Sequence, residues 1–253
     1  MRRFPAGTHL SILLLVLVTT GCATKAGWQY VPNAARPAGA QVPLVVAVER
    51  FQDERGTSNS RYFWLCIIPL VPYCSSSYSQ PENANGFLTE AAYNFRPSDD
   101  LAEATTIELR QTGMFKDVFV TNRSSDPSAQ LTVRGTIDST QWDGSKYSYL
   151  LGPYGSLLWV FGLPIGSAEN NLRIKLDLVE RATGQPLWST DINQNYSITE
   201  GLYYNYAADF AYPQMYRTGM EAAVASLEGY VSQQPPAFWQ RIASESGLVL
   251  PSR

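Results

Sequence analysis

The segment that most constrains the fold is residues 172–192. Apolar side chains occupy every second position from Leu172 to Leu178, and charged side chains occupy the positions between them. This period of two is typical of a strand with one buried and one solvent-facing side. The turn sequence Ala-Thr-Gly-Gln follows at 182–185, and the next segment carries Trp188 and Ile192. We therefore predict an antiparallel hairpin.

The remaining elements are predicted from periodicity and from residues that begin or end helices. Pro97 and two aspartates are typical of a helix start, and Gly113 of its end. Strands are expected over 43–51, 114–122 and 130–142, and helices over 97–112 and about 213–232. Their order predicts the α/β (α+β) class, with a single mixed β-sheet of about five strands, two main helices packed on it and two apolar loop insertions.

The N-terminus predicts the cellular compartment. Arg2 and Arg3 precede a short apolar stretch, Leu10 to Val18, which ends in small residues and Cys22. This order is typical of a secretory signal peptide and resembles the lipobox of bacterial lipoproteins. The resemblance implies lipidation at Cys22, a palmitate-type anchor, and the periplasmic face of the outer membrane, because Ala23 stands where inner-membrane lipoproteins often carry Asp. The alternative is an ordinary signal peptide with a coincidental cysteine.

These observations divide the chain into four parts. A signal peptide is expected over 1–21, a lipidated cysteine and flexible tether over 22–42, a single α/β domain over 43–234 with insertions at 52–95 and 150–167, and a short helix with a loose tail over 235–253.

Charge and histidine content exclude several classes of function. Charged residues make up 16% of the chain, aromatic residues 12%, and the net charge is −3, which argues against both disorder and nucleic-acid binding. The only histidine, His9, lies in the expected signal peptide. A chain without imidazole cannot run a Ser-His-Asp mechanism or ligate zinc through histidine. We expect no catalytic residue, no metal site and no cofactor.

Two cysteines remain after Cys22. Cys66 and Cys74 are eight positions apart, with two prolines between them. In an oxidising periplasm such a pair can close across a turn, so we predict a structural disulfide. The alternative is two buried free thiols.

The two insertions contain large apolar side chains where loops usually carry polar ones. In one interpretation the two stretches, 61–73 and 156–166, pack against each other as a second small core. In the other they form an exposed patch that contacts the membrane or a partner protein. The residues expected to make that contact are Trp64, Ile67, Ile68, Leu157, Trp159 and Phe161.

A tyrosine-rich segment, 199–217, raises the possibility of glycan or peptidoglycan binding. Aromatic faces stack on sugar rings, and Asp209 can hydrogen-bond hydroxyl groups. The candidate contacts are Tyr203, Tyr204, Tyr206 and Asp209. The alternative is that these aromatic residues pack the loop that leads into the last long helix.

Asp53 and Glu54 follow a strand end and suggest a cation site. The alternative is a solvated turn in which Arg55 is the local counter-charge.

Four segments together resemble a group of bacterial envelope lipoproteins. They are VVAVERFQDERG, LAEATTIELRQTGMFKDVFV, AQLTVRGTID and the ATGQPLW hairpin, within 43–232. The fold looks like that of the curli-secretion-channel lipoprotein and of the N-terminal domain of the Tol-system translocation protein. The resemblance implies no catalytic residues, and the curli channel's membrane hairpins have no evident counterpart here.

The expected function is therefore that of a non-enzymatic envelope lipoprotein, an interaction or assembly module held at the membrane by its lipid. Its partner is expected to be an envelope protein or a second copy of the chain, and not a nucleic acid. The alternative is a glycan-binding lipoprotein that uses the 203–216 aromatic segment.

Overall fold

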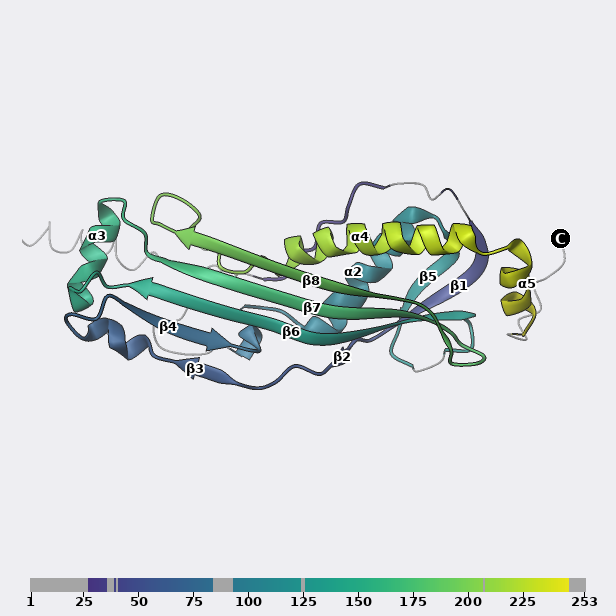
Figure 1. Cartoon of the computed structure of the whole chain (residues 1–253), viewed down its shortest axis with the longest axis horizontal. Coiled ribbons are helices and arrows are strands. Elements are labelled where there is room, and N and C mark those ends of the chain that lie inside the picture. The colour runs from purple at the N-terminus through teal and green to yellow at the C-terminus, as the bar shows by residue number, and fades with distance from the viewer. Residues whose placement is uncertain are drawn as a thin grey trace, which may run out of the picture.

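The computed structural model describes residues 27–35, 39, 41–83, 93–123, 126–206 and 208–245 (Figure 1). The expected signal peptide, Cys22 and the last eight residues lie outside the described residues. The described part is elongated: three long strands run along it, and the two long helices lie toward one end.

The three long strands are β6 (Leu131–Tyr147), β7 (Gly166–Glu180) and β8 (Pro186–Glu200). Both neighbouring pairs are antiparallel, and Ile174 of β7 lies opposite Ile192 of β8. The even-numbered side chains from Leu172 to Leu178 are buried. The predicted hairpin is confirmed, and it is longer than the alternation in the sequence indicated.

The opposite edge of β6 pairs in turn with three strands. Two of them, β1 (Val42–Glu49) and β2 (Gln52–Asp53), run parallel to β6. The third, β4 (Tyr73–Tyr78), runs antiparallel to it. Beyond them, β5 (Phe115–Thr121) pairs with β1 in parallel, and β3 (Asn59–Arg61) pairs with β4 antiparallel. All belong to one eight-stranded mixed sheet.

The expectation of about five strands and two main helices is wrong, although the α+β class is right. The described residues form eight strands and four α-helices. The three additional strands, β2, β3 and β4, lie in the 52–95 segment that we expected to be a loop insertion. They are short and polar, so their sequences carry little of the apolar alternation that marks a half-buried strand.

The helices begin and end where local chemistry favours it. The helix α2 (Pro97–Thr112) has acidic residues in its first turn, and the Asp100 carboxylate accepts the Arg96 backbone N–H at 2.8 Å. It ends at Gly113 with φ of 62°, a left-handed conformation that costs glycine little. The other helices are α3 (Ser156–Val160), α4 (Tyr212–Gln233) and α5 (Pro236–Glu245).

The main core lies between the sheet and helices α2 and α4. Tyr216 of α4 is fully buried, and its hydroxyl lies 2.6 Å from the Thr105 hydroxyl of α2. Gly219 faces Ile192 of β8 so closely that a Cβ would overlap the isoleucine side chain. This contact holds α4 tightly against β8. Among the described residues, no helix combines the length and the hydrophobicity that a membrane crossing requires.

Part of the segment expected to be a flexible tether is docked on this core. Trp28 stacks on Phe95 with ring centroids 4.9 Å apart, and Tyr30 donates a 2.6 Å hydrogen bond to Glu108 of α2. Gly27 forms an isolated bridge with Asn94. Within the segment expected to be a tether, Gly27, Trp28 and Tyr30 are therefore packed on the domain.

Candidate functional site

The end of the sheet away from the long helices is built from three separate segments. They are 62–73, which contains the 3-10 helix η1 (Phe63–Ile67); 148–165, which contains η3 (Gly152–Gly155) and α3; and the turn 201–206. The first segment connects β3 to β4, the second connects β6 to β7, and the third follows the end of β8. We call the surface formed by these three segments the apolar tip.

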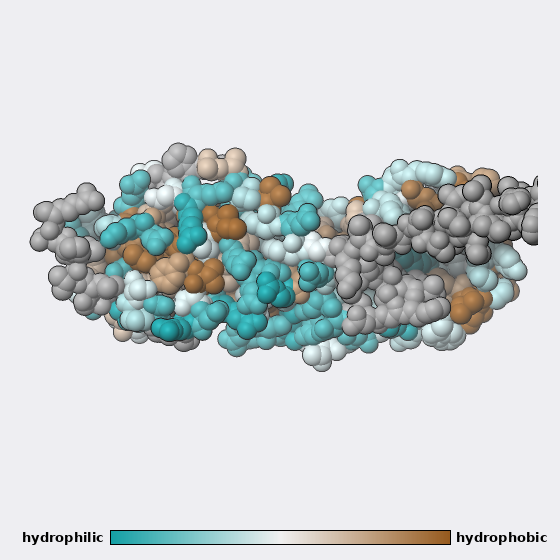
Figure 2. Space-filling view, turned by 180° about the vertical axis from the view of Figure 1, so that it is seen from behind, coloured by the Kyte–Doolittle hydropathy of each residue, from teal (hydrophilic) through white to brown (hydrophobic). Residues whose placement is uncertain are grey.

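Nearly all the exposed large hydrophobic side chains of the described chain belong to the apolar tip. Outside it, the only such side chains among the described residues are Val31, Ile107 and Val120. Those of the tip are Tyr62, Trp64, Ile67, Ile68, Leu70, Tyr73, Leu150, Leu151, Tyr154, Leu157, Val160, Phe161, Leu163, Leu202, Tyr203, Tyr204 and Tyr206. In Figure 2 hydrophobic residues gather at the left-hand end, hydrophilic ones cover the middle of the rear face, and a smaller hydrophobic patch lies at the right-hand end, which is the α3 end in Figure 1.

Backbone hydrogen bonds join the first two segments of the tip. The N–H of Leu70 donates to the oxygen of Leu150 at 2.8 Å, and the N–H groups of Ser148 and Tyr149 both donate to Pro72 at 3.0 and 3.1 Å. The Ser148 hydroxyl also donates to the oxygen of Val71. The two insertions thus lie side by side, as the second-core interpretation required, but most of their large apolar side chains face solvent.

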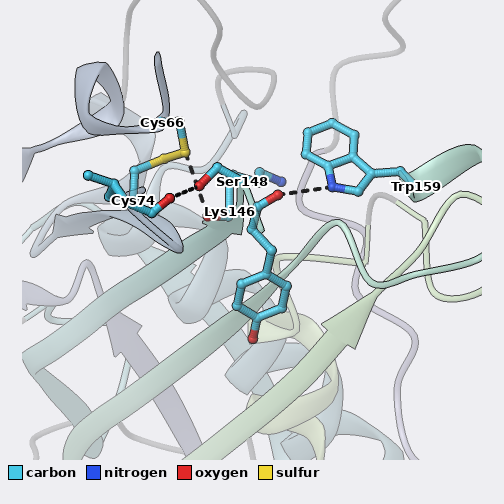
Figure 3. The surroundings of a disulfide bond; sticks show 7 residues. Cys66, Cys74, Lys146, Ser148 and Trp159 are labelled. Carbon is cyan, nitrogen blue, oxygen red and sulfur yellow. Dashed lines mark hydrogen bonds between the residues drawn. A yellow bond between two sulfur atoms is a disulfide. The ribbon is translucent and has the colours of Figure 1, made fainter. Parts of the chain in front are cut away.

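The predicted disulfide is present between Cys66 and Cys74, with Cα atoms 5.2 Å apart. It links η1 to β4, and the Cys74 side chain is buried against the end of β6 near Lys146 and Ser148 (Figure 3). The bond therefore fastens the first tip segment to the sheet.

Trp159 differs from the other predicted contact residues. Its side chain is half-buried, and the indole Nε1–H donates a 3.1 Å hydrogen bond to the backbone oxygen of Tyr147 (Figure 3). This hydrogen bond holds α3 onto the end of β6. Trp64, Ile67, Ile68, Leu157 and Phe161 are exposed as the patch interpretation requires, with Phe161 at 80%.

Charge is absent from the apolar tip. The sequence has no Asp, Glu, Lys or Arg in 62–79, 147–168 or 201–208. An ion pair joins Lys146 to Glu200 at 3.7 Å, at the base of the tip where β6 and β8 end. The tip is thus an uncharged surface next to a charged strand end.

Three of the four candidate glycan contacts are exposed, and the fourth is buried. Tyr203 and Tyr206 are 70% exposed and Tyr204 is 39% exposed, all in the tip. The Tyr203 hydroxyl donates to the backbone oxygen of Val160 at 2.7 Å, so this turn packs beside α3. The tyrosine faces remain available to a ligand.

The prediction that Asp209 contacts a glycan is wrong, because Asp209 is only 6% exposed. Burial raises the pKa of its carboxyl group. Its backbone oxygen accepts hydrogen bonds from Trp142 at 3.2 Å and Asn170 at 2.8 Å. The following Phe210 stacks on Tyr93 with centroids 4.5 Å apart, so this half of the tyrosine-rich segment packs into the core.

Asp53 does not form an open cation site. Both of its carboxylate oxygens accept hydrogen bonds from Arg55, at 2.8 and 2.7 Å, and this guanidinium also binds Glu82 at 2.6 Å. The Arg55 side chain is 2% exposed, so the expected solvated turn is instead a buried ion-pair cluster. Its hydrogen bonds hold the pKa of Asp53 below the usual value. No cluster of three or more metal-ligating side chains occurs within the described ranges.

Two hollows lie away from the tip. One, of about 40 Å³, lies between α2 and α4 and is lined by residues including Glu108 and Glu221. The other, of about 280 Å³, is lined by Arg50, Arg96 and Asp99 near the start of α2. In the second, Arg50 is paired with Asp99 at 2.8 Å. The tip remains the more distinctive candidate surface.

Comparison with known proteins does not assign this chain to a family. No protein-family model and no curated protein matches the sequence. A Xanthomonas campestris protein of family DUF330 is 12% identical, with 83% of this chain and 98% of that chain covered and a TM-score of 0.42. A Helicobacter pylori homolog of the neuraminyllactose-binding hemagglutinin is 11% identical, with 88% and 100% covered and a TM-score of 0.38.

A dodecameric PelC variant from Paraburkholderia phytofirmans is 12% identical, with 73% of this chain and 90% of that chain covered and a TM-score of 0.32. At these sequence identities and TM-scores, the matches assign no function to this chain. The resemblance to the curli and Tol lipoproteins accordingly remains an expectation drawn from residue patterns.

Proposed function

We propose that this chain is a lipid-anchored protein of the bacterial cell envelope that acts as an interaction or assembly module, with the apolar tip as its docking surface. The anchor would be Cys22, at the periplasmic face of the outer membrane. This part of the proposal rests on the sequence order of basic residues, apolar stretch, small residues and cysteine.

The observation that carries the proposal is the gathering of uncharged, exposed apolar side chains at one end of an elongated molecule. Exposed apolar patches on soluble proteins are usually small, and larger ones mark sites of protein or membrane contact. Here the patch is held by a disulfide and by backbone hydrogen bonds between two segments distant in sequence. A surface with fixed backbone geometry can meet a partner with little loss of conformational entropy.

The proposal assigns no catalytic step to the chain. The only histidine precedes Cys22 and would be removed with the signal peptide. The clustered carboxylates of Asp53 and Glu82 are bound to Arg55, where they join β2 to η2 (Pro81–Asn83). Groups used in this way contribute to stability and are poorly placed to exchange protons with a substrate.

Glycan binding is a weaker alternative on this structure. It retains the exposed faces of Tyr203 and Tyr206, but it loses Asp209, the hydrogen-bonding group that would orient a sugar. Sugar sites combine aromatic stacking with placed polar groups. The remaining tyrosines are continuous with the apolar tip and are better explained as part of that surface.

Site-specific photo-crosslinking in intact cells tests the proposal. A photoreactive amino acid is placed at Leu157 in the tip and, as a control, at Asn193, an exposed polar position on β8. We expect defined adducts from position 157, to an envelope protein, a second copy or lipid, and few from position 193. Absence of adducts at 157, or equal yields at both positions, would overturn the proposal.

A further inference from the structure

The apolar tip has the chemistry of a membrane-interface surface. We propose that its occupant is the surface of the lipid bilayer, so that the protein contacts the membrane through the tip as well as through its anchor. This inference rests on the proposed function and specifies the partner of the same surface.

The side chains at the tip match the chemistry of the membrane interface. Trp64 and several tyrosines are exposed there beside leucine, isoleucine and phenylalanine. Tryptophan and tyrosine favour the headgroup region because each combines an apolar ring with a polar atom. Charged side chains are costly in the hydrocarbon region, and the tip has none. The Lys146–Glu200 pair at its base marks the level at which charged groups begin.

The backbone of the tip is arranged for an environment with few water molecules. Burial of a polar backbone group in lipid is costly unless the group is hydrogen-bonded within the protein. The N–H groups of Phe161, Gly162 and Leu163 at the end of α3 donate within that turn at 3.0–3.3 Å. In η1, the N–H groups of Leu65 and Ile68 donate at 3.0 and 3.1 Å. In the turns that carry the exposed apolar side chains, these backbone N–H groups are therefore already hydrogen-bonded within the protein.

The anchor can reach the level of the tip. Gly27 pairs with Asn94, whose neighbour Tyr93 stacks on Phe210, and Phe210 stacks in turn on Trp142 of β6. This chain of contacts connects Gly27 to Trp142, which lies five residues before the end of β6.

From Trp142, β6 continues for five residues to Tyr147 at the tip, about 17 Å at the rise of an antiparallel strand. Five residues also separate Gly27 from Cys22, with a fully extended reach of about 17 Å. A lipid on Cys22 and the apolar tip can therefore enter one membrane surface together.

This placement defines the orientation of the molecule. With the tip on the bilayer, the 17-residue strand β6 leads away from the lipid, and its far end lies about 50 Å away along the strand. The end that carries α4 and α5 would then be presented to the periplasm, as the opposite ends in Figure 1 indicate. The membrane contact and the helical end would thus serve separate partners.

Quenching of tryptophan fluorescence by brominated lipid tests the inference. The purified lipidated chain is reconstituted into phosphatidylcholine vesicles with or without brominated acyl chains. Trp64 is 58% exposed at the tip, whereas Trp142 and Trp239 are buried in the body. Trp159 is half-buried at the tip, so we expect bromine-dependent quenching in the parent chain and a clear reduction of that quenching in Trp64→Phe, with a remainder that comes from Trp159.

A matched pair of variants separates tip insertion from anchoring alone. Leu157→Ser with Phe161→Ser removes two exposed apolar side chains from the tip, and Ile107→Ser with Val120→Ser removes two from elsewhere. In unlipidated protein carrying Cys22→Ser, we expect the tip pair to lower the partition coefficient into phosphatidylcholine vesicles about tenfold or more. The Ile107/Val120 pair should leave it unchanged.

The outcomes distinguish the two proposals. If Trp64 is not quenched by brominated lipid and the tip nevertheless forms defined adducts with a protein in cells, the bilayer inference is overturned and the docking function stands. If the tip shows neither quenching nor adducts, both fail. Quenching that is equal in the parent and in Trp64→Phe also overturns the bilayer inference.

Discussion

The indole of Trp159 donates a hydrogen bond to the backbone oxygen of Tyr147 at 3.1 Å, which joins α3 to the last residue of β6. This contact separates two neighbouring aromatic residues by role. Trp159 is half-buried and fixes the shape of the apolar tip, whereas Phe161, two positions later, is 80% exposed and is available for contact.

Trp159→Phe should therefore destabilise the tip, because it leaves the Tyr147 oxygen without this donor. A lost hydrogen bond of this kind costs about 1–3 kcal/mol. Phe161→Ser should change stability by less than about 0.5 kcal/mol, as is usual for exposed positions. Hydrogen exchange of the 152–163 amides measures both effects. Equal exchange rates in the two variants would contradict the distinction.

The disulfide should contribute measurably to stability. Its eight-residue separation corresponds to about 2–3 kcal/mol of free energy of unfolding in the chain-entropy account. We expect Cys66→Ser with Cys74→Ser to lower the urea midpoint and to raise hydrogen exchange in η1. An unchanged midpoint together with unchanged exchange in η1 would show that the bond does not fasten this segment.

Arg55→Met should be among the more damaging charge substitutions, because it leaves Asp53 and the partly buried Glu82 without their shared cation. Breaking a buried ion pair typically costs about 3 kcal/mol or more. The control is Arg50→Met, which breaks an ion pair with Asp99 whose arginine is 59% exposed and should cost less than about 1 kcal/mol. Urea unfolding at neutral pH compares them, and equal losses would refute the structural role of Arg55.

The Arg55 cluster also predicts a dependence of stability on pH. Because the hydrogen bonds from Arg55 lower the folded-state pKa of Asp53, its contribution is present above the unfolded pKa of about 3.9 and is lost as pH falls through the folded value. The parent should therefore lose more stability than Arg55→Met on acidification below about pH 4. Parallel stability curves for the two proteins would contradict this account.

Asp209 should behave in the opposite way. Burial raises its pKa, so the charged form is penalised in the folded state and stability falls as pH rises above the carboxyl group's ordinary value. Asp209→Asn should be more stable than the parent at pH 7, and the difference should shrink as pH approaches 4. A variant that is less stable at pH 7 would mean that the carboxylate makes a favourable interaction in the folded chain.

The sequence predicts those elements in which apolar side chains recur with a clear period. Leu172 to Leu178 reveal β7 because one face of the strand is buried along its length, and the stripe from Tyr216 to Val231 reveals α4 because one helical face packs on the sheet. The 97–112 helix agrees with α2 because its start and end carry proline and glycine.

Elements without such a period were missed. β4 buries Cys74, Ser76 and Tyr78, and a buried serine gives no apolar signal. The sequence also does not reveal that β6 continues past Trp142. The Trp142 ring lies where a Cβ on Gly144 would be, so the strand has a glycine at a position where an apolar residue would have continued the alternation. α3 has only five residues, too few to show a helical period.

The candidate site was predicted in part for a similar reason. Composition alone shows that 61–73 and 156–166 are apolar, and the structure is needed to show that they lie side by side and face outward. The role of Trp159 and the burial of Asp209 depend on contacts with distant residues, Tyr147 and Trp142, that no local pattern reveals. The docking of Trp28 had one sequence signal, an aromatic residue two positions before Tyr30 in a segment otherwise typical of a tether.

Hydroxyl-radical footprinting of the native protein in isolated cell envelopes tests most directly whether the apolar tip is a covered surface. The oxidation rates of Trp64 and Phe161 are compared between envelopes and the purified soluble chain, with Ile107 and Val120 as exposed references outside the tip. The account predicts strong protection of the two tip residues in envelopes and none of the references. Equal oxidation of Trp64 and Phe161 in both preparations would contradict it.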